Sequence, residues 1–198
     1  EGAATIAKPH QWVKYPGTVG RAIRGVTIKI LDDEGNELPP NTIGNIYIEV
    51  AGVSFEYKDD PEQTKSAYRG NSFTIGDVGE MNDEGFLFIR DRAKDMIITG
   101  GVNVYPQEVE ATLLTHPAIA DVAVIGLPDQ EWGESIKAVV QLKPDFTGTS
   151  ELGDEIIAFC KQHLASYKCP RSVDFRDSLP RTDAGKLYKR QLRDEYAA

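Results

Sequence analysis

The sequence has few of the residues that build metal centres and disulfide frameworks. Its 198 residues include two cysteines and three histidines. Cys160 and Cys169 lack the close spacing of a metal-binding pair. The histidines, which are His10, His116 and His163, stand far apart in the chain. This scarcity predicts neither a Cys/His metal site nor a disulfide framework, and it favours a reducing compartment such as the cytoplasm.

Long apolar runs and excess positive charge are missing as well. No apolar run approaches the ~18 residues of a membrane-spanning helix. The formal net charge is −9, and nucleic-acid backbones bind basic surfaces, so we expect no extended nucleic-acid interface. The first residues, EGAATIAKPH, contain neither an initiator Met nor a signal-peptide pattern. We therefore expect the chain to come from the interior of a longer protein.

The first half of the chain predicts strands and turns. The composition, 40% hydrophobic and 27% charged, suits a globular fold with a buried core. Residues 26–31 and 44–50 alternate in hydrophobicity, as strands do. Residues 77–92 predict a hairpin with Gly85 in its turn, and residues 95–105 predict two short strands about a Gly-Gly pair.

The second half mixes helical and strand patterns. Pro106 opens a helix predicted over residues 106–116. A second, amphipathic helix is predicted over residues 150–167 with Ser150 as its N-cap. His163 lies on the apolar face of that helix, which predicts a buried core histidine. Further strands are expected at 121–127, 135–142 and 171–175, and residues from Lys186 onward are expected to be helical.

A β-rich first part and a mixed second part imply two units and an α+β fold class. The charged stretch RDRAKD, residues 90–95, is the expected seam between them.

Several segments have both a structural and a functional interpretation. Asp77 follows Gly76 and is either a turn residue or a carboxylate that accepts hydrogen bonds from sugar hydroxyls. The segment DRAKDMIITGGVNVYPQEVE is either a surface ion-pair cluster or a place where a ligand chain passes close to the backbone, since Gly has no Cβ. Trp132 is either a stacking platform or part of loop packing.

Lys186, in PRTDAGKLYKR, resembles a phosphate-loop lysine only superficially. That motif needs Gly where Pro180 stands and Ser or Thr where Leu187 stands. Taken alone, the stretch favours a solvated lysine at a helix start over a catalytic lysine.

Four segments taken together change this interpretation. They are FTIGDVG, DRAKDMIITGGVNVYPQEVE, HPAIADVAVIGLPDQEWGE and LPRTDAGKLYKRQL. In this order and spacing they resemble motifs of the C-terminal part of the adenylate-forming superfamily, and the resemblance covers the whole chain. The segment KDMIITGGVNVYPQEVE is similar to the form that this motif takes in CoA ligases. The segments FTIGDVG and FLFIRDRAKDMII are most similar to those of bacterial fatty-acyl-CoA synthetases.

The resemblance implies a fold and a reaction. Residues 1–91 would end the large N-terminal domain as a small β-barrel subdomain, residues 92–95 would be a hinge, and residues 96–198 would be a mobile α+β domain. Such enzymes join a carboxylic acid to AMP from Mg²⁺-bound ATP, and CoA then displaces AMP to give a thioester. The phosphate loop and acyl pocket precede this segment in relatives, so we expect the chain alone to be inactive.

The resemblance also assigns roles to individual residues. Lys186 would be the catalytic lysine of adenylate formation. Asp77 and Arg92 would bind the ribose hydroxyls, and Lys94 would be the hinge. Ile75 stands where many relatives have Thr, which removes a hydroxyl near this site. The residues expected along the CoA and pantetheine path are Gly100, Gly101, Trp132, Lys168 and Arg171, and Glu1 is the expected Mg²⁺ ligand.

Two alternatives and one regulatory hypothesis remain. The acid could instead be aryl, short or branched, because the acyl pocket is not in this chain. A non-catalytic interaction module is a further alternative, although the presence of Arg92, Lys94, Gly100-Gly101 and Lys186 together argues against it. Lys186 also fits a Pro-x4-Gly-Lys acetylation pattern, which implies a lysine acetyltransferase and a deacetylase as partners.

Overall fold

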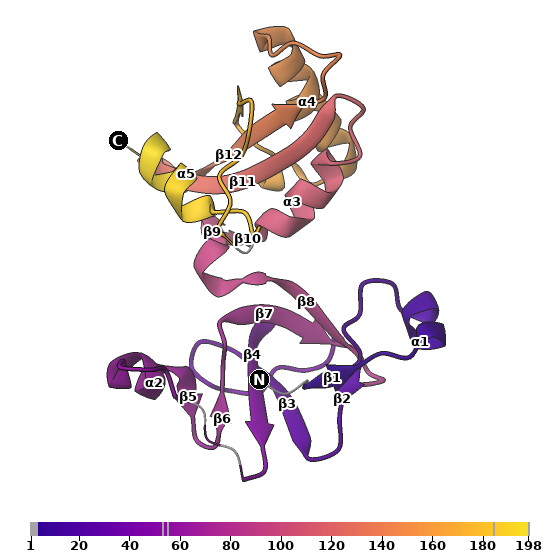
Figure 1. Cartoon of the computed structure of the whole chain (residues 1–198), viewed down its shortest axis with the longest axis vertical. Coiled ribbons are helices and arrows are strands. Elements are labelled where there is room, and N and C mark those ends of the chain that lie inside the picture. The colour runs from indigo at the N-terminus through magenta and orange to yellow at the C-terminus, as the bar shows by residue number, and fades with distance from the viewer. Residues whose placement is uncertain (1–3, 53, 55, 184, 198) are drawn as a thin grey trace. The chain divides into compact units, whose positions relative to one another are not determined.

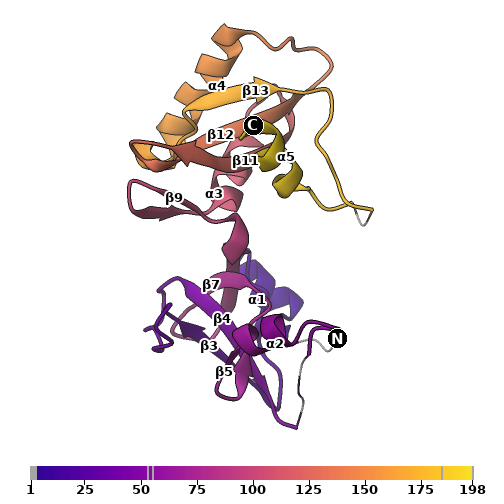
Figure 2. The same cartoon turned by 90° about the vertical axis from the view of Figure 1, so that its left-hand side faces the viewer.

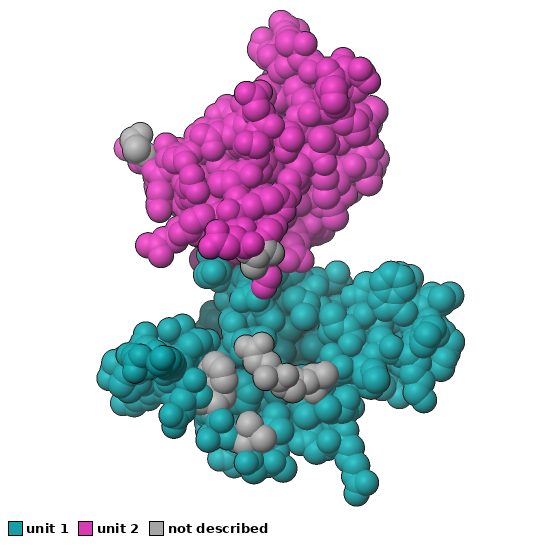
Figure 3. All heavy atoms as spheres, in the orientation of Figure 1, with its two compact units in different colours: residues 1–94 teal, residues 95–198 magenta. Residues whose placement is uncertain are grey.

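The chain forms two compact units, residues 1–94 and 95–198. Its structure is a computed structural model that describes residues 4–52, 54, 56–183 and 185–197 (Figure 1). Figure 3 colours the two units separately. The boundary between them falls within residues 92–95, where the hinge is expected; motion about it stays a prediction.

Unit 1 is built around an antiparallel sheet. In the described residues the strand order is β5-β6-β4-β7-β8, with β3 also paired to β4. The elements are β1 (Thr5–Ile6), α1 (Pro9–Lys14), β2 (Arg21–Ala22), β3 (Val26–Leu31), β4 (Gly44–Val50), α2 (Pro61–Ala67), β5 (Tyr68–Arg69), β6 (Ser72–Phe73), β7 (Asp77–Met81) and β8 (Leu87–Arg92). The strands predicted at 26–31 and 44–50 are confirmed. The pairings among the described residues leave this sheet open, so a closed β-barrel stays a prediction.

The predicted hairpin is confirmed as β7 and β8. Gly85 has a φ of +78°, and the Asn82 side chain accepts hydrogen bonds from the amides of Glu84 and Phe86. The register places Asp77 opposite Arg92, at the end of the hairpin away from its turn.

Unit 2 has a sheet of five strands within the described residues. The order is β10-β9-β12-β11, and β13 pairs with β12 in parallel. The elements are η1 (Ala93–Asp95), which spans the boundary, then β9 (Ile97–Thr99), β10 (Val102–Val104), α3 (Pro106–Leu113), β11 (Ile119–Asp129), β12 (Gly133–Leu142), α4 (Ser150–His163), η2 (Ser166–Lys168), β13 (Ser172–Phe175) and α5 (Lys189–Tyr196).

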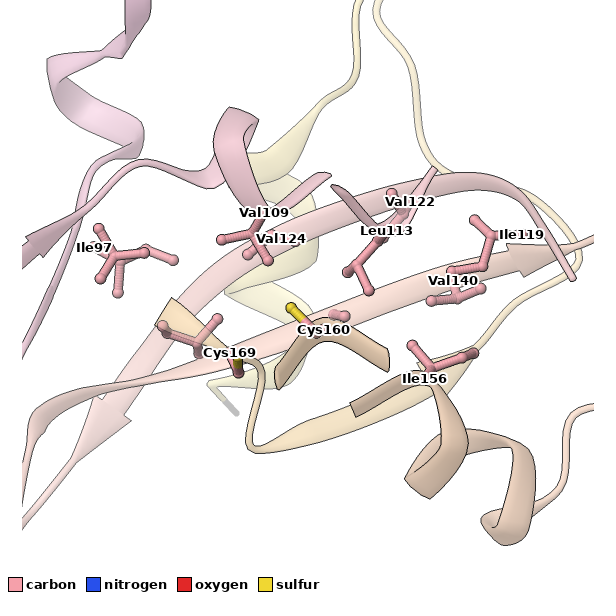
Figure 4. Close-up of a cluster of buried hydrophobic side chains, with 13 residues drawn as sticks. Ile97, Val109, Leu113, Ile119, Val122, Val124, Val140, Ile156, Cys160 and Cys169 are labelled. Atoms are coloured by element: carbon pink, nitrogen blue, oxygen red, sulfur yellow. The ribbon is translucent and has the colours of Figure 1, made fainter. Parts of the chain in front are cut away.

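Successive side chains of β11 point to opposite faces of this sheet, and each face has a buried core. Val122 and Val124 join a buried cluster with Val109 and Leu113 of α3 and with Ile156 of α4 (Figure 4). The intervening residues of β11 join the second cluster, whose buried members are Ala123, Ile125, Val139, Leu179 and Leu192. Helices α3 and α4 therefore pack on one face of the sheet and α5 on the other (Figure 2).

Two local predictions in unit 2 were wrong. The N-cap of α4 is Thr149, whose hydroxyl accepts from the Leu152 amide at 3.2 Å, so Ser150 is the first helical residue. His163 is exposed because it ends the helix, where its Nδ1 lies 2.8 Å from the Phe159 carbonyl oxygen. The buried histidine is His116.

Helix boundaries also differ from the prediction. The helix starting at Pro106 ends at Leu113, and α4 ends at His163 rather than 167. The last helix begins at Lys189, because Arg181 pairs with Leu187 and the Tyr188 amide donates to the Pro180 carbonyl. Lys186 thus lies in a turn before α5. Across the described residues, no helix is long and apolar enough to cross a bilayer.

Candidate functional site

Asp77 and Arg92 form an ion pair in unit 1. Arg92 Nε lies 2.8 Å from Asp77 Oδ1, with the Asp77 side chain 12% exposed and the Arg92 side chain 47% exposed. The carboxylate is therefore nearly buried, whereas the guanidinium reaches solvent. An acid that accepts hydrogen bonds and a guanidinium that donates them can together bind vicinal hydroxyls.

The backbone before Asp77 holds this pair in place. Gly76 has a φ of +83°, a left-handed conformation that favours glycine, and its amide donates to Thr74 Oγ1. The Ala93 amide donates to the Gly76 carbonyl at 2.8 Å, which joins the turn to the end of β8. The exposed Ile75 contributes no hydroxyl here, and Thr74 supplies the one that closes the turn.

Gly100, Trp132 and Arg171 come together in unit 2. The Gly100 amide donates to the Trp132 carbonyl at 2.8 Å. The Arg171 guanidinium carbon lies 4.1 Å from the centroid of the Trp132 ring, a cation–π contact. A Cβ on Gly100 would lie 3.0 Å from a Trp132 ring carbon, whereas one on Gly101 would meet no atom within 4 Å. Trp132 therefore takes part in loop packing, and with 36% of its surface exposed it still presents aromatic area to solvent.

Lys168 is held by an ion pair. Its Nζ donates to both carboxylate oxygens of Glu108, in α3, at 2.7 Å each. Among the residues that the structure describes, no hydrogen bond, ion pair or cation–π contact joins Lys168 to Trp132 or Arg171. As a ligand for CoA phosphates, Lys168 would have to share its charge with Glu108, and that role stays a prediction.

Lys186 lies on an exposed turn of unit 2. The Thr182 amide donates to the Lys186 carbonyl at 2.8 Å, and the Lys186 amide donates to Thr182 Oγ1 at 3.3 Å. No ion pair among the described residues engages the Lys186 ammonium. Its backbone is therefore fixed while its charge faces solvent.

The sequence reasoning missed two ion pairs on either side of this turn. Arg181 pairs with Asp121 at the start of β11, and Lys189 pairs with Glu110 of α3. The cations of PRTDAGKLYKR were the available signal, but their partners are remote in sequence. Lys94, the expected hinge residue, is exposed within η1, and the neighbouring Asp95 pairs with Arg193 of α5 at 2.9 Å.

The expected Mg²⁺ ligand, Glu1, lies outside the described residues. Among the residues that are described, no group of three or more His, Cys, Asp or Glu side chains is arranged to hold a metal ion. These residues thus provide no fitted Mg²⁺ site.

Comparisons with known proteins find relatives over the whole length of this chain. The family described as AMP-binding enzyme C-terminal domain matches residues 108–186. The chain is 39% identical over 197 residues to the long-chain-fatty-acid–CoA ligase FadD13 of Mycobacterium tuberculosis, covering all of this chain and 38% of that protein. It is 41% identical over 181 residues to acetyl-coenzyme A synthetase of Bacillus subtilis, covering 90% of this chain and 32% of the relative.

Solved structures share the fold. O-succinylbenzoate CoA synthetase (MenE) from Bacillus subtilis, in complex with the acyl-adenylate intermediate OSB-AMP, superposes with a TM-score of 0.87 at 33% identity, covering 98% of this chain and 39% of that one. The chain thus spans between 32% and 39% of the length of these proteins. It belongs to the adenylate-forming superfamily, as a C-terminal part that carries the AMP-binding enzyme C-terminal domain.

Proposed function

We propose that this chain is part of an AMP-forming acid–CoA ligase that activates a fatty acid. The observation that carries the proposal is the combination, in one chain, of the Asp77–Arg92 pair with an exposed lysine on an ordered turn. The similarity to FadD13 over the whole chain supports a fatty acid as substrate. The chain covers little more than a third of that relative, so the activity is proposed for the longer protein.

In the first half-reaction, a carboxylate oxygen attacks the α-phosphorus of ATP and pyrophosphate leaves. Both reactants are anionic and repel each other as they approach. The Lys186 ammonium, held by its turn, would stand between the carboxylate and the α-phosphate and stabilise the developing charge. Asp77 would accept hydrogen bonds from the ribose hydroxyls, and Arg92, whose guanidinium reaches solvent, would donate to them.

In the second half-reaction, the CoA sulfur attacks the acyl carbon and AMP leaves. The backbone at Gly100 and Gly101 would line the pantetheine path, since a Cβ at Gly101 would point into open space. Trp132 and Arg171 would contact the CoA side with ring and guanidinium, and Lys168 would assist from its pair with Glu108. Rotation of unit 2 about Lys94 would withdraw Lys186 from the reaction site and bring in the groups that line the pantetheine path.

Mg²⁺ would accompany ATP and offset its phosphate charge. The described residues offer no cluster that fits the ion, and Glu1 is the ligand expected from this chain. A small β-barrel subdomain at residues 1–91 and a cytoplasmic location complete the proposal. The subdomain follows from the family resemblance, and the location follows from the cysteine usage.

The central test is Lys186→Ala in the full-length protein. We expect pyrophosphate release from ATP and fatty acid to fall by about 10²-fold or more, while thioester formation from supplied acyl adenylate and CoA stays near the wild-type rate. Arg190→Ala, on a neighbouring exposed cation, is the matched control. Equal loss of both half-reactions would contradict the role of Lys186.

Two further measurements bear on the alternatives. This chain alone should release no pyrophosphate from ATP with any acid; release would show that it holds a complete adenylation site. A panel of fatty, acetic and aryl acids tested on the full-length protein would separate the fatty-acid proposal from an aryl specificity, which the likeness to the o-succinylbenzoate enzyme favours. A non-catalytic module would turn over none of them.

We also propose that acetylation of Lys186 stops the first half-reaction, because acetylation removes the ammonium charge. The exposure of this side chain makes it accessible to a lysine acetyltransferase and a deacetylase. Mass spectrometry of the protein from its native cells should detect the modification. An unmodified Lys186 beside acetylated lysines elsewhere in the chain would count against it.

A further inference from the structure

The turn that carries Lys186 is closed by its own hydrogen bonds. The Gly185 amide donates to the Thr182 carbonyl at 2.8 Å, and Gly185 has a φ of +77°. Arg181 and Leu187 pair across the base of the turn. These bonds set the shape of the turn, but they do not attach it to the rest of unit 2.

Arg181 attaches the first arm of the turn. One nitrogen of its guanidinium donates to the Gly185 carbonyl at 2.8 Å, and another donates to the Asp121 carboxylate. The same side chain thus braces the turn internally and ties it to the start of β11. The planar guanidinium suits this double contact, because its donors lie on separate nitrogens in a fixed geometry.

Lys189 attaches the second arm. Its Nζ lies 2.7 Å from Glu110 Oε1, and that oxygen also accepts from the Val124 amide at 2.7 Å. The Lys189 and Glu110 side chains are 10% and 13% exposed, so this ion pair is nearly buried. It joins the start of α5 to α3 and to the middle of β11.

Apolar contacts support both arms. Leu179 and Leu192 are buried in the second core cluster against Ala123 and Ile125 of β11, and Leu187 packs on the same cluster. The neighbouring Arg190 differs: it lies 3.9 Å from Asp194, and the two side chains are 77% and 74% exposed. Of the two adjacent cations, only Lys189 is built into the interior.

We propose that Lys189, with Glu110, and Arg181, with Asp121, are positioning residues that hold the Lys186 turn at a fixed place on the sheet of unit 2. This inference rests on the proposed role of Lys186. A rate that depends on an ammonium between two anions is sensitive to displacement of that ammonium by about 1 Å, which can cost ~10²-fold. Without its two attachments, the placement of the turn on the sheet would vary, and the hydrogen bonds within the turn would open more often.

The test uses Lys189→Met, Glu110→Gln and Arg181→Met in the full-length protein, with Arg190→Met as the control. We expect the kcat of pyrophosphate release to fall about tenfold or more in the first three variants, with little change in the KM for ATP. Thioester formation from supplied acyl adenylate should stay within about twofold, since Lys186 takes no part in that step. Lys189→Arg, which keeps the charge, should restore part of the lost kcat, whereas loss of packing alone would not be rescued by charge.

A second measurement is made on this chain itself. Amide hydrogen exchange at Thr182, Gly185 and Lys186 should become faster in Lys189→Met and Arg181→Met, and should be unchanged in Arg190→Met. If Lys189→Met does not fold, Arg181→Met decides the matter, because the Arg181 side chain is 48% exposed and its removal leaves no buried charge.

The outcomes separate the two proposals. If Lys186→Ala leaves adenylation intact, the proposed function of Lys186 fails. If Lys186→Ala blocks adenylation while Lys189→Met and Arg181→Met match Arg190→Met, the role of Lys186 stands and the positioning inference is overturned. Equal losses in both half-reactions for the positioning variants would also overturn it, because they would indicate general damage to unit 2.

Discussion

The two glycines at the turn between β9 and β10 are adjacent, yet their surroundings differ. Gly100 has a φ of +58° and packs against Trp132, whereas Gly101 has a φ of +77° and faces open space. A side chain at either position is strained by the backbone, but only at Gly100 does it also meet the Trp132 ring.

We therefore expect Gly100→Ala to lower the free energy of unfolding of this chain by about 2 kcal/mol, and Gly101→Ala by about 1 kcal/mol. Urea unfolding followed by circular dichroism measures both. Equal losses would mean that backbone conformation alone accounts for the cost and that the Trp132 contact contributes nothing.

Among the residues that the structure describes, Cys160 has the one large pKa shift. Burial, followed by the neighbouring Cys169, raises the pKa of the Cys160 thiol from 9.0 to about 12. The native chain therefore keeps this proton at pH values where the unfolded chain loses it. The resulting stabilisation is complete below pH 9 and is lost as the pH rises toward 12.

Between pH 9 and pH 11, the free energy of unfolding should fall by up to about 1.4 kcal/mol per pH unit from this thiol. Other groups titrate in the same range, so the comparison is with Cys160→Ala, which should show a shallower slope. Identical slopes for the two chains would sink the assignment.

At the scale of elements, the start of α4 depends on one hydroxyl. Thr149 Oγ1 accepts the Leu152 amide, whereas the side chain of Ser150 is exposed on the first turn. The two residues are both common N-caps, and the tertiary position of the helix start selects the first.

Thr149→Ala should thus destabilise the chain by about 1 kcal/mol, and Ser150→Ala should change stability by less than ~0.5 kcal/mol. Chemical denaturation of the two variants makes the comparison. A larger loss at Ser150 would place the cap one residue later.

At the scale of the whole molecule, each unit has its own core. The cores of unit 2 draw residues from β9 to α5, and unit 1 has a separate cluster about Ile28, Ile30, Ile46 and Leu87. A polypeptide whose contacts divide in this way can fold in parts.

We expect residues 95–198, expressed alone, to unfold cooperatively and to keep the amide protection that they have in the full chain. A shorter piece, residues 119–198, lacks β9, β10 and α3 and should not fold cooperatively, since Val109 and Leu113 leave the core with them. If residues 119–198 unfold cooperatively, or if residues 95–198 do not, the boundary between the two units is misplaced.

Much of this fold follows from local pattern. The alternation of residues 26–31 and 44–50, the turn glycine at Gly85 and the proline at 106 predict elements that the structure contains, because period and turn chemistry depend on near neighbours. The ends of the helices and the burial of His163 were mispredicted. The apolar pattern of a helix continues in the sequence beyond the last residue that the sheet covers.

For the candidate site, the sequence by itself determined which groups are present, and the order of the motifs predicts roles for Asp77, Arg92, Gly100 and Lys186. Only the tertiary structure decided that Arg92 binds Asp77, that Lys168 is held by Glu108, and that Lys189 rather than Arg190 is buried. The reason is physical. Residue type sets what a side chain can bind, whereas its partner depends on which faces of distant elements meet when the core closes.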